Sequence, residues 1–477
     1  MKNIINLAFN KYLIFILLII YPIIITYFYS FNYYWIGGDA DSYIGFSFES
    51  IKTFFSQHRS FFLPLIIKTW SFVFEAPYGD THYLGYFLLF LFLLSVWFLY
   101  STMINLEFNH ILCGTIVYGI VFTYNLAILH SHLNTDIIGL TLFLFSVNFF
   151  ITYAHKNEKK YLYFFSTLIF LCISARPSYI ISMPCFVYYF YKFNGNIFKK
   201  DNFIKFVKFI FSANILIILF LLIRFIYTDS IGLISFSGVL ASNHLTFLAE
   251  KSDLKHVSYE NKTLIKNLID RREKLHGKCN LSYEQAKKEQ LDLNELRGHC
   301  YNEQMMSAWL ESIKLNENIE PFEKGDIKNY NAWEYVPSLS KFFNLKDNVF
   351  IDSQLMSSTK EIIFLNLREY LDVVINAAIK GSLFLYFLAI KYLIILFLIM
   401  HILIKFYLEK ISLSKRDKIF INFNIFHYFL LMLMTSFMNY PHPRYYLCQS
   451  ILLIPCIFLY LFSKIKLNYF IKSKTYS

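Results

Sequence analysis

Long apolar runs dominate this sequence and limit what it can fold into. Ten runs have membrane-spanning length or nearly so, near residues 12–31, 83–104, 111–129, 136–154, 161–175, 178–192, 203–227, 381–404, 419–438 and 445–463. Of the 477 residues, 56% are hydrophobic and only 16% are charged. In a lipid bilayer a helix satisfies its own backbone hydrogen bonds, so such runs are expected to span as helices. The sequence therefore predicts an all-α polytopic membrane protein with about ten transmembrane helices.

The formal charge of +12 is unevenly distributed along the chain. Residues 229–370 hold 18 Lys and Arg against 21 Asp and Glu, a net −3, so the remainder holds 27 against 12, a net +15. Positive charge confined to the apolar part is expected where Lys and Arg set the orientation of membrane loops. No basic helix or basic patch interleaved with aromatic residues favours nucleic-acid binding instead.

Loop charges predict the orientation. With cytoplasmic N- and C-termini, the inner loops carry 19 Lys and Arg and the short outer loops carry five. This bias requires that segment 61–75 does not span, since a span there would reverse the side of every later loop. Segment 61–75 is short and contains Pro64 and Lys68, so we expect an interfacial helix in the first outer loop.

Three regions follow from this arrangement. Residues 1–228 form a seven-span module, residues 229–370 a mainly helical extracytoplasmic domain, and residues 371–477 a three-span module. Cys279 and Cys300 are the only cysteines outside the apolar runs. Because both are expected in an oxidising compartment, the sequence predicts a disulfide between them.

The unusual polar residues gather in the predicted outer loops. They are Asp39, Asp41, His58 and Arg59 in the first loop, His130, His132, Asn134 and Asp136 before the fourth span, Arg176 and Pro177 after the fifth run, and His442 and Arg444 in the last loop. The inner loops carry mostly Lys, which orientation explains. The outer Asp, His and Arg residues are not explained by orientation, so they are the best functional signal in the chain.

These residue types suit one kind of chemistry. An exposed carboxylate can act as a general base toward a hydroxyl or amine, and Arg or His can bind a phosphate leaving group. At a membrane surface, both fit a lipid-phosphate donor that gives its headgroup to an acceptor. Structural alternatives stay open: the acids can be solvated or cap helices, and Arg176 and Arg444 can anchor the interface. No zinc-protease, P-loop, Rossmann or nucleophile-elbow motif occurs.

This layout resembles the GT-C glycosyltransferases, integral membrane enzymes that use polyprenyl-phosphate sugars, in particular the protein mannosyltransferase and aminoarabinose transferase group. The resemblance covers roughly residues 1–230. It rests on an acidic motif of the form Asp-x-x-x-Tyr after the first span (Asp39 to Tyr43), a following helix with Arg and Pro (His58 to Lys68), a second acid opening the fourth span (Asp136), and Arg176-Pro177.

The resemblance implies a GT-C-like bundle and a transferase that inverts the sugar carbon. It implies a general base at Asp39, or else Asp41, with Asp136 orienting donor or acceptor. Lipid phosphate and substrate would be bound by Tyr43, Arg59, Arg176, His442 and Arg444. Family members differ in metal dependence, so Mg²⁺ or Mn²⁺ held by the Asp residues is compatible with the resemblance, and no other cofactor is implied.

The expected partners are a polyprenyl-phosphate-linked sugar and an extracytoplasmic glycan, lipid or protein acceptor of the cell envelope. The expected location is a bacterial inner membrane, with the active site on the outer face. Two other functions stay open. A surface-polysaccharide polymerase has a similar span count but is expected to use an Arg-rich outer loop, whereas the large loop here is net acidic. A lipid-linked glycan transporter needs charges near the membrane midplane, and these are few.

Overall fold

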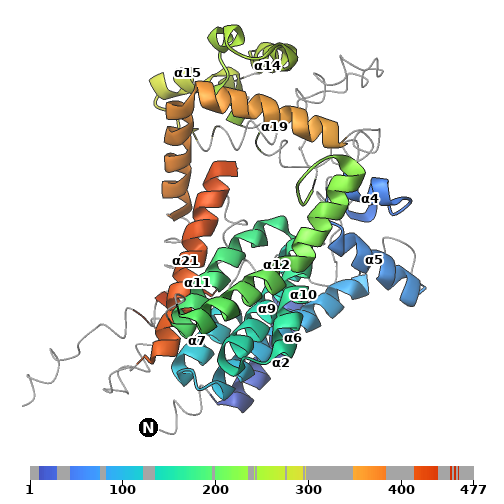
Figure 1. The fold of residues 1–477 in the computed structure, drawn as a ribbon, viewed down its shortest axis with the longest axis vertical. Coiled ribbons are helices and arrows are strands. Elements are labelled where there is room, and N and C mark those ends of the chain that lie inside the picture. Colours follow the sequence, from blue (N-terminus) through green and yellow to red (C-terminus); the bar gives the residue numbers. More distant parts are fainter. Residues whose placement is uncertain are drawn as a thin grey trace, which may run out of the picture.

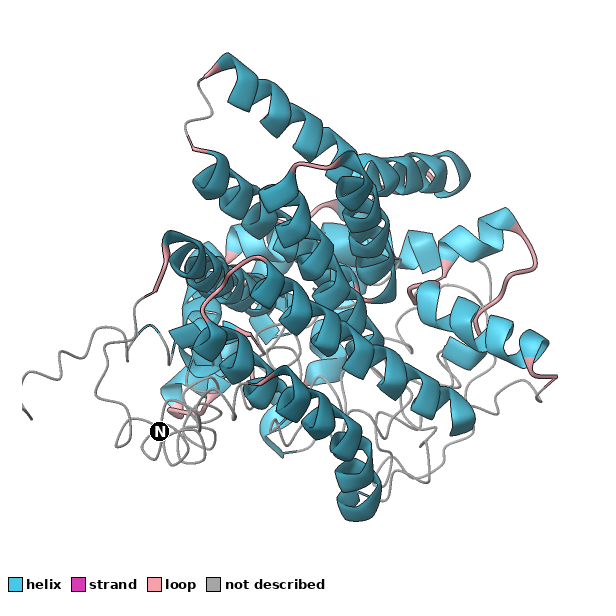
Figure 2. Cartoon of the chain, turned by 90° about the horizontal axis from the view of Figure 1, so that it is seen from below, coloured by secondary structure: helices cyan, strands magenta, loops and turns pink. Residues whose placement is uncertain are grey.

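The structure, a computed structural model, is described for most of the apolar bundle and for parts of the polar domain. The described residues are 10–29, 43–57, 59–75, 82–121, 135–195, 199–234, 247–273, 277–293, 348–382 and 413–438, with single positions near 241–245, at 296 and within 452–460. All regular secondary structure in these residues is helical (Figures 1 and 2). The predicted all-α fold is confirmed for this part of the chain.

Helices form where the sequence has its apolar runs. They are α2 (Lys11–Tyr29), α6 (His82–Asn105), α7 (His110–Val121), α9 (Thr135–Lys156), α10 (Lys159–Ala175), α11 (Ser182–Asn194), α12 (Lys200–Thr228) and α21 (Lys415–Met438). Four of them, α6, α9, α12 and α21, are long and apolar enough to cross a membrane. Most of the runs at 381–404 and 445–463 lies outside the described residues, so a total of ten spans stays a prediction.

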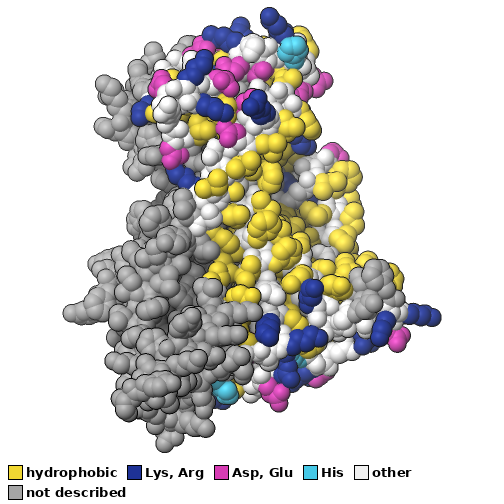
Figure 3. Space-filling view, turned by 90° about the vertical axis from the view of Figure 1, so that its left-hand side faces the viewer, with side chains coloured by type: hydrophobic (Ala, Val, Ile, Leu, Met, Phe, Trp, Pro, Cys, Tyr) yellow, Lys and Arg dark blue, Asp and Glu magenta, His cyan; other side chains and the backbone are white. Residues whose placement is uncertain are grey.

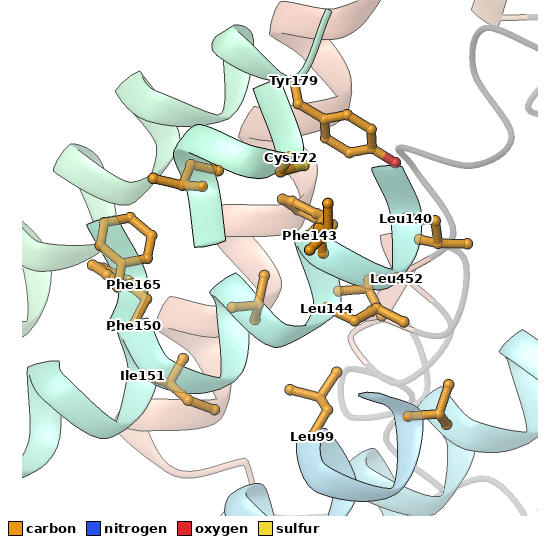
Figure 4. Close-up of a cluster of buried hydrophobic side chains, with 14 of the residues drawn as sticks. Leu99, Leu140, Phe143, Leu144, Phe150, Ile151, Phe165, Cys172, Tyr179 and Leu452 are labelled. Carbon is orange, nitrogen blue, oxygen red and sulfur yellow. The ribbon is translucent and has the colours of Figure 1, made fainter. Parts of the chain in front are cut away.

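Helix α9 is the centre of the bundle. Its side chains are buried on nearly every face, whereas α12 is mostly exposed. Such helices, apolar all round, are either enclosed by other helices or face lipid. Aromatic rings fill the space around α9: the ring centroid of Phe150 lies 5.3 Å from that of Phe165 and 4.7 Å from that of Phe186. Figure 4 shows part of this core.

The loops between the helices collect at opposite ends of the bundle. At one end, the backbone amide of Asn109 donates to the Asp417 carboxylate over 3.0 Å, and the Phe108 ring lies 5.6 Å from that of His155. At the other end, the Ser60 hydroxyl donates to the Ala175 carbonyl over 2.7 Å. Among the described residues, these segments of the loops predicted to face inward and outward are therefore separated in space.

Segment 61–75 forms a short helix, α5 (Phe62–Val73). Its length of about 18 Å is well below the roughly 30 Å of a bilayer core. It begins beside Ser60, and the Trp70 ring packs 5.6 Å from Phe87 near the start of α6. Both ends of α5 thus lie at the same end of the bundle, and α5 projects sideways from it (Figure 1). Helix α5 is thus too short to cross a bilayer core by itself, and the side of the membrane on which it lies stays a prediction.

The polar region has a hydrophobic core of its own. It contains α14 (Tyr259–Arg272), α15 (Tyr283–Lys288) and α19 (Asn348–Leu365), followed by a helix over residues 367–382. Ile265, Leu268, Leu355, Ile362 and Val373 belong to one buried cluster that joins these helices. The side chain of Cys279 and all of Cys300 lie outside the described residues, so their disulfide stays a prediction.

The surface changes character between the two parts. Acidic and basic side chains are mixed over the polar domain, and hydrophobic side chains cover much of the bundle below it (Figure 3). Helix α12 exposes Phe203, Phe211 and Ile226 by 54%, 62% and 73%. Exposed apolar side chains on this scale are expected where a bundle faces lipid.

Candidate functional site

Four of the eight predicted site residues are described, and all four lie in one place. Tyr43, Arg59, Asp136 and Arg176 meet at the end of the bundle that carries the predicted outer loops. The other four, Asp39, Asp41, His442 and Arg444, lie outside the described residues.

A buried ion pair between Asp136 and Arg176 forms the centre of this site. Asp136 is the second residue of α9 and is 0% exposed. Arg176 follows the last residue of α10, and its Nη1 contacts Asp136 Oδ1. The start of a helix also favours a carboxylate, because the backbone amides there carry partial positive charge. Arg176 Nε donates in addition to the Ser178 hydroxyl over 3.3 Å, so the guanidinium is fixed at two points.

A glycine one turn into α9 lets the Arg176 segment approach closely. A Cβ atom on Gly139 would lie 2.8 Å from Tyr179 Cε2 and 3.4 Å from Arg176 Cβ. Tyr179 belongs to the 3₁₀ helix η1 (Pro177–Ile181) and packs 5.2 Å from Phe143 (Figure 4). A side chain at residue 139 would push this ring away from α9. Gly139 thus shapes the contact that brings Arg176 to Asp136.

The first predicted outer loop packs next to the Asp136–Arg176 ion pair. The Tyr43 hydroxyl lies 3.4 Å from the hydroxyl of Thr135, the residue before Asp136. The guanidinium carbon of Arg59 lies over the Tyr43 ring, 5.4 Å from its centroid, within the range of a cation–π contact. The bond from Ser60 to Ala175 fixes the same loop beside Arg176. Two arginines and one buried carboxylate therefore share this site.

The two acids of the first loop are close to Tyr43 in the sequence. Asp41 is two residues before Tyr43, and Asp39 is four residues before it. Their roles stay predictions, because both lie outside the described residues.

The described residues do not form a metal site. Among them, no group of three His, Cys, Asp or Glu side chains is close enough to hold an ion. Asp136 is the carboxylate of this site in the described part, and Arg176 already neutralises it. A site for Mg²⁺ or Mn²⁺ would need Asp39 and Asp41, which lie outside the described residues.

Arg224 supports the site in a way that the sequence did not reveal. It lies in the last two turns of α12, only 1% exposed, and its Nε donates to the Phe55 carbonyl over 3.0 Å. Phe55 belongs to α4 (Ile51–Ser56), just before Arg59. Arg224 Nη1 also lies against Gly232, where a Cβ atom would be 2.8 Å away. The only sequence signal is a charge close to the end of the apolar run 203–227, well separated from Lys205 and Lys208 at its start.

Arg224→Met is expected to lower the free energy of unfolding by about 1–3 kcal/mol, because the Phe55 carbonyl loses its buried donor. The measurement is unfolding of the purified protein in detergent micelles, together with trypsin cleavage after Lys52 in α4, which should become faster. Lys205→Met makes a similar change at an exposed position of the same helix and should leave both readouts unchanged. Equal cleavage of Arg224→Met and wild type would contradict this role.

Comparison with protein-family models, with curated proteins and with solved structures returned no match for this chain.

Proposed function

We propose that the protein is a membrane glycosyltransferase that moves a sugar from a polyprenyl-phosphate donor to an extracytoplasmic acceptor. One observation carries the proposal: the first outer loop, the start of α9 and the turn after α10 meet at the Asp136–Arg176 pair. These three segments are far apart in the sequence, and each contains a residue that the donor chemistry requires.

Charge supports a phosphate ligand. Arg59 and Arg176 bring two guanidinium groups to the described site, and Asp136 contacts only one of them, Arg176. Guanidinium groups suit phosphate because their donors are arranged as a planar fork. Asp136 and Ser178 orient Arg176, and the Tyr43 ring supports Arg59. This arrangement stabilises the charge that grows on the phosphate oxygen as the sugar leaves.

The proposed reaction is a single displacement. The acceptor hydroxyl attacks the anomeric carbon while Asp39 or Asp41 takes its proton, and the bond from that carbon to the phosphate oxygen breaks. Polyprenyl phosphate leaves with the bonding electrons, and the configuration at the sugar carbon is inverted. A general base of this kind contributes typically about 10²–10⁴-fold to the rate.

The test uses the double variant Asp39→Asn/Asp41→Asn in a cell that lacks the native gene, with envelope glycans profiled by mass spectrometry. The wild-type gene should restore one glycan species that the double variant does not restore at equal membrane levels. Glu49→Gln removes another, exposed carboxylate of the same loop and should restore the profile. Full restoration by the double variant would reject the proposal. Loss of long chains with intact single repeats would instead favour a polysaccharide polymerase.

A further inference from the structure

A cavity in the polar domain lies apart from the site described above. It has a volume of about 490 Å³ and opens between the end of α15 and the helix over residues 367–382. Its polar lining residues are Lys287, Gln290, Asp292, Asp372, Asn376 and Lys380. Its volume is within the range of about 300–1,000 Å³ found for small-molecule sites.

Hydrogen bonds hold the polar groups of this cavity in place. The Tyr283 hydroxyl donates to Asp372 Oδ2 over 2.5 Å, and Lys287 Nζ donates to the same oxygen over 3.2 Å. Asn376 Nδ2 donates to the other Asp372 oxygen over 3.2 Å. Lys380, in the helix over residues 367–382, forms an ion pair with Asp292, which follows α15. The bond from Tyr283, helped by Lys287, lowers the pKa of Asp372, so this carboxylate is ionised at neutral pH.

The charges of the cavity cancel. Two lysines face two aspartates, so an anion would meet two carboxylates and a cation would meet two ammonium groups. The lining nevertheless offers many donors and acceptors, with aliphatic surface from Leu291, Leu293 and Ile379. Sugar hydroxyls both donate and accept hydrogen bonds, as hydroxyl groups do, and the C–H faces of a sugar ring are apolar. We propose that this cavity binds a neutral saccharide unit.

The cavity is fixed to the bundle through one of its walls. The Tyr428 hydroxyl of α21 donates to the Gly381 carbonyl over 2.9 Å, and the Tyr370 hydroxyl donates to the Phe437 carbonyl over 3.0 Å. A bound saccharide is therefore held at a set position relative to α21. The binding site depends only on the cavity, whereas its use for a glycan acceptor rests on the proposed function.

The experiment measures binding without transfer. Saturation-transfer difference NMR on the purified full-length protein in detergent micelles uses glucose, galactose and N-acetylglucosamine, with glucuronate and glucosamine as charged counterparts. At least one neutral sugar should give a signal above that of empty micelles, and the charged counterparts should give weaker signals. No signal from any neutral sugar, or stronger binding of a charged counterpart, would overturn the proposal.

Two variants test whether the sugar that gives the NMR signal is bound in this cavity. Gln290→Gly removes a lining side chain at a backbone φ of +55°, which glycine adopts without strain. Asp372→Asn weakens the hydrogen-bond network. Each should reduce the affinity by about three- to tenfold, the effect of one hydrogen bond. If Asp372→Asn fails to fold, the affinity of Gln290→Gly alone shows whether the sugar binds in this cavity.

Glu273→Gln is the matched control, because Glu273 pairs with Lys251 on the surface of the same domain, away from the cavity. It should bind as wild type does. Wild-type affinity in Gln290→Gly and Asp372→Asn would overturn the cavity assignment. Binding in a protein that transfers no sugar would refute the proposed function alone, and transfer without binding here would refute only the saccharide site.

Discussion

Asp136→Asn is expected to lower the free energy of unfolding by about 3–5 kcal/mol, the usual cost of removing one partner from a buried ion pair. Asp136 is fully buried and Arg176 nearly so, with a side chain that is 12% exposed. The variant removes the buried carboxylate that Arg176 contacts and leaves the guanidinium charge without this partner. Chemical unfolding of the purified protein in detergent micelles measures the change.

The double variant Asp136→Asn/Arg176→Gln tests how much of the lost stability comes from breaking the ion pair and how much from each residue by itself. Replacing both charged groups by neutral amides removes the uncompensated buried charge, which is the main cost of the single variant. We therefore expect the double variant to recover most of the loss, with a coupling energy of at least about 3 kcal/mol between the two positions. Under the proposed function, sugar transfer should stay lost, because the arginine proposed to bind phosphate is gone.

An exposed pair provides the control for this cycle. Lys160 and Glu158 are paired over 2.8 Å with side chains that are 62% and 45% exposed. Glu158→Gln should leave the unfolding transition where it is in the wild type, because water solvates both groups in either state. If Asp136→Asn unfolds at the wild-type denaturant concentration, the pair does not hold α9 to the Arg176 turn.

The sequence predicted the helices, and the order of these helices explains why two of the predicted site residues lie side by side. Apolar runs of helical length determine where helices form, and the loop of two residues between α9 and α10 makes these helices antiparallel neighbours. An antiparallel hairpin places the first turn of α9 beside the end of α10. Asp136 and Arg176 occupy those two positions, so the element order places them near each other, and Gly139 allows the close contact.

The remaining contacts could not be predicted in this way. The approach of Tyr179 to Gly139 depends on how η1 packs against α9, and no periodic pattern encodes that distance. Arg224 reaches the Phe55 carbonyl across 169 positions of chain. Contacts of this kind arise from tertiary packing, which loop charge and hydrophobic periodicity do not specify. The sequence located the charged groups but not the packing that orients them.

Asp39→Asn is expected to reduce the rate of sugar transfer by about 10²–10⁴-fold, and Asp41→Asn by less than about tenfold. Under the proposed function the base is expected four residues before Tyr43, which is Asp39. An amide of the same shape cannot accept the proton of the acceptor hydroxyl, so the chemical step slows while donor binding persists. The measurement is incorporation of radiolabelled sugar from a polyprenyl-phosphate donor into membrane acceptors.

Three further measurements show whether Asp39 or Asp41 acts as the general base. Asp39→Glu keeps a carboxylate and should retain more activity than Asp39→Asn, whereas a purely structural role need not give this order. Donor KM should change little in Asp39→Asn, because Arg59 and Arg176 still bind the phosphate under the proposed function. Membrane levels of each variant are measured in parallel. A large loss confined to Asp41→Asn would move the base to Asp41, and wild-type rates in both variants would remove the first-loop acids from the mechanism.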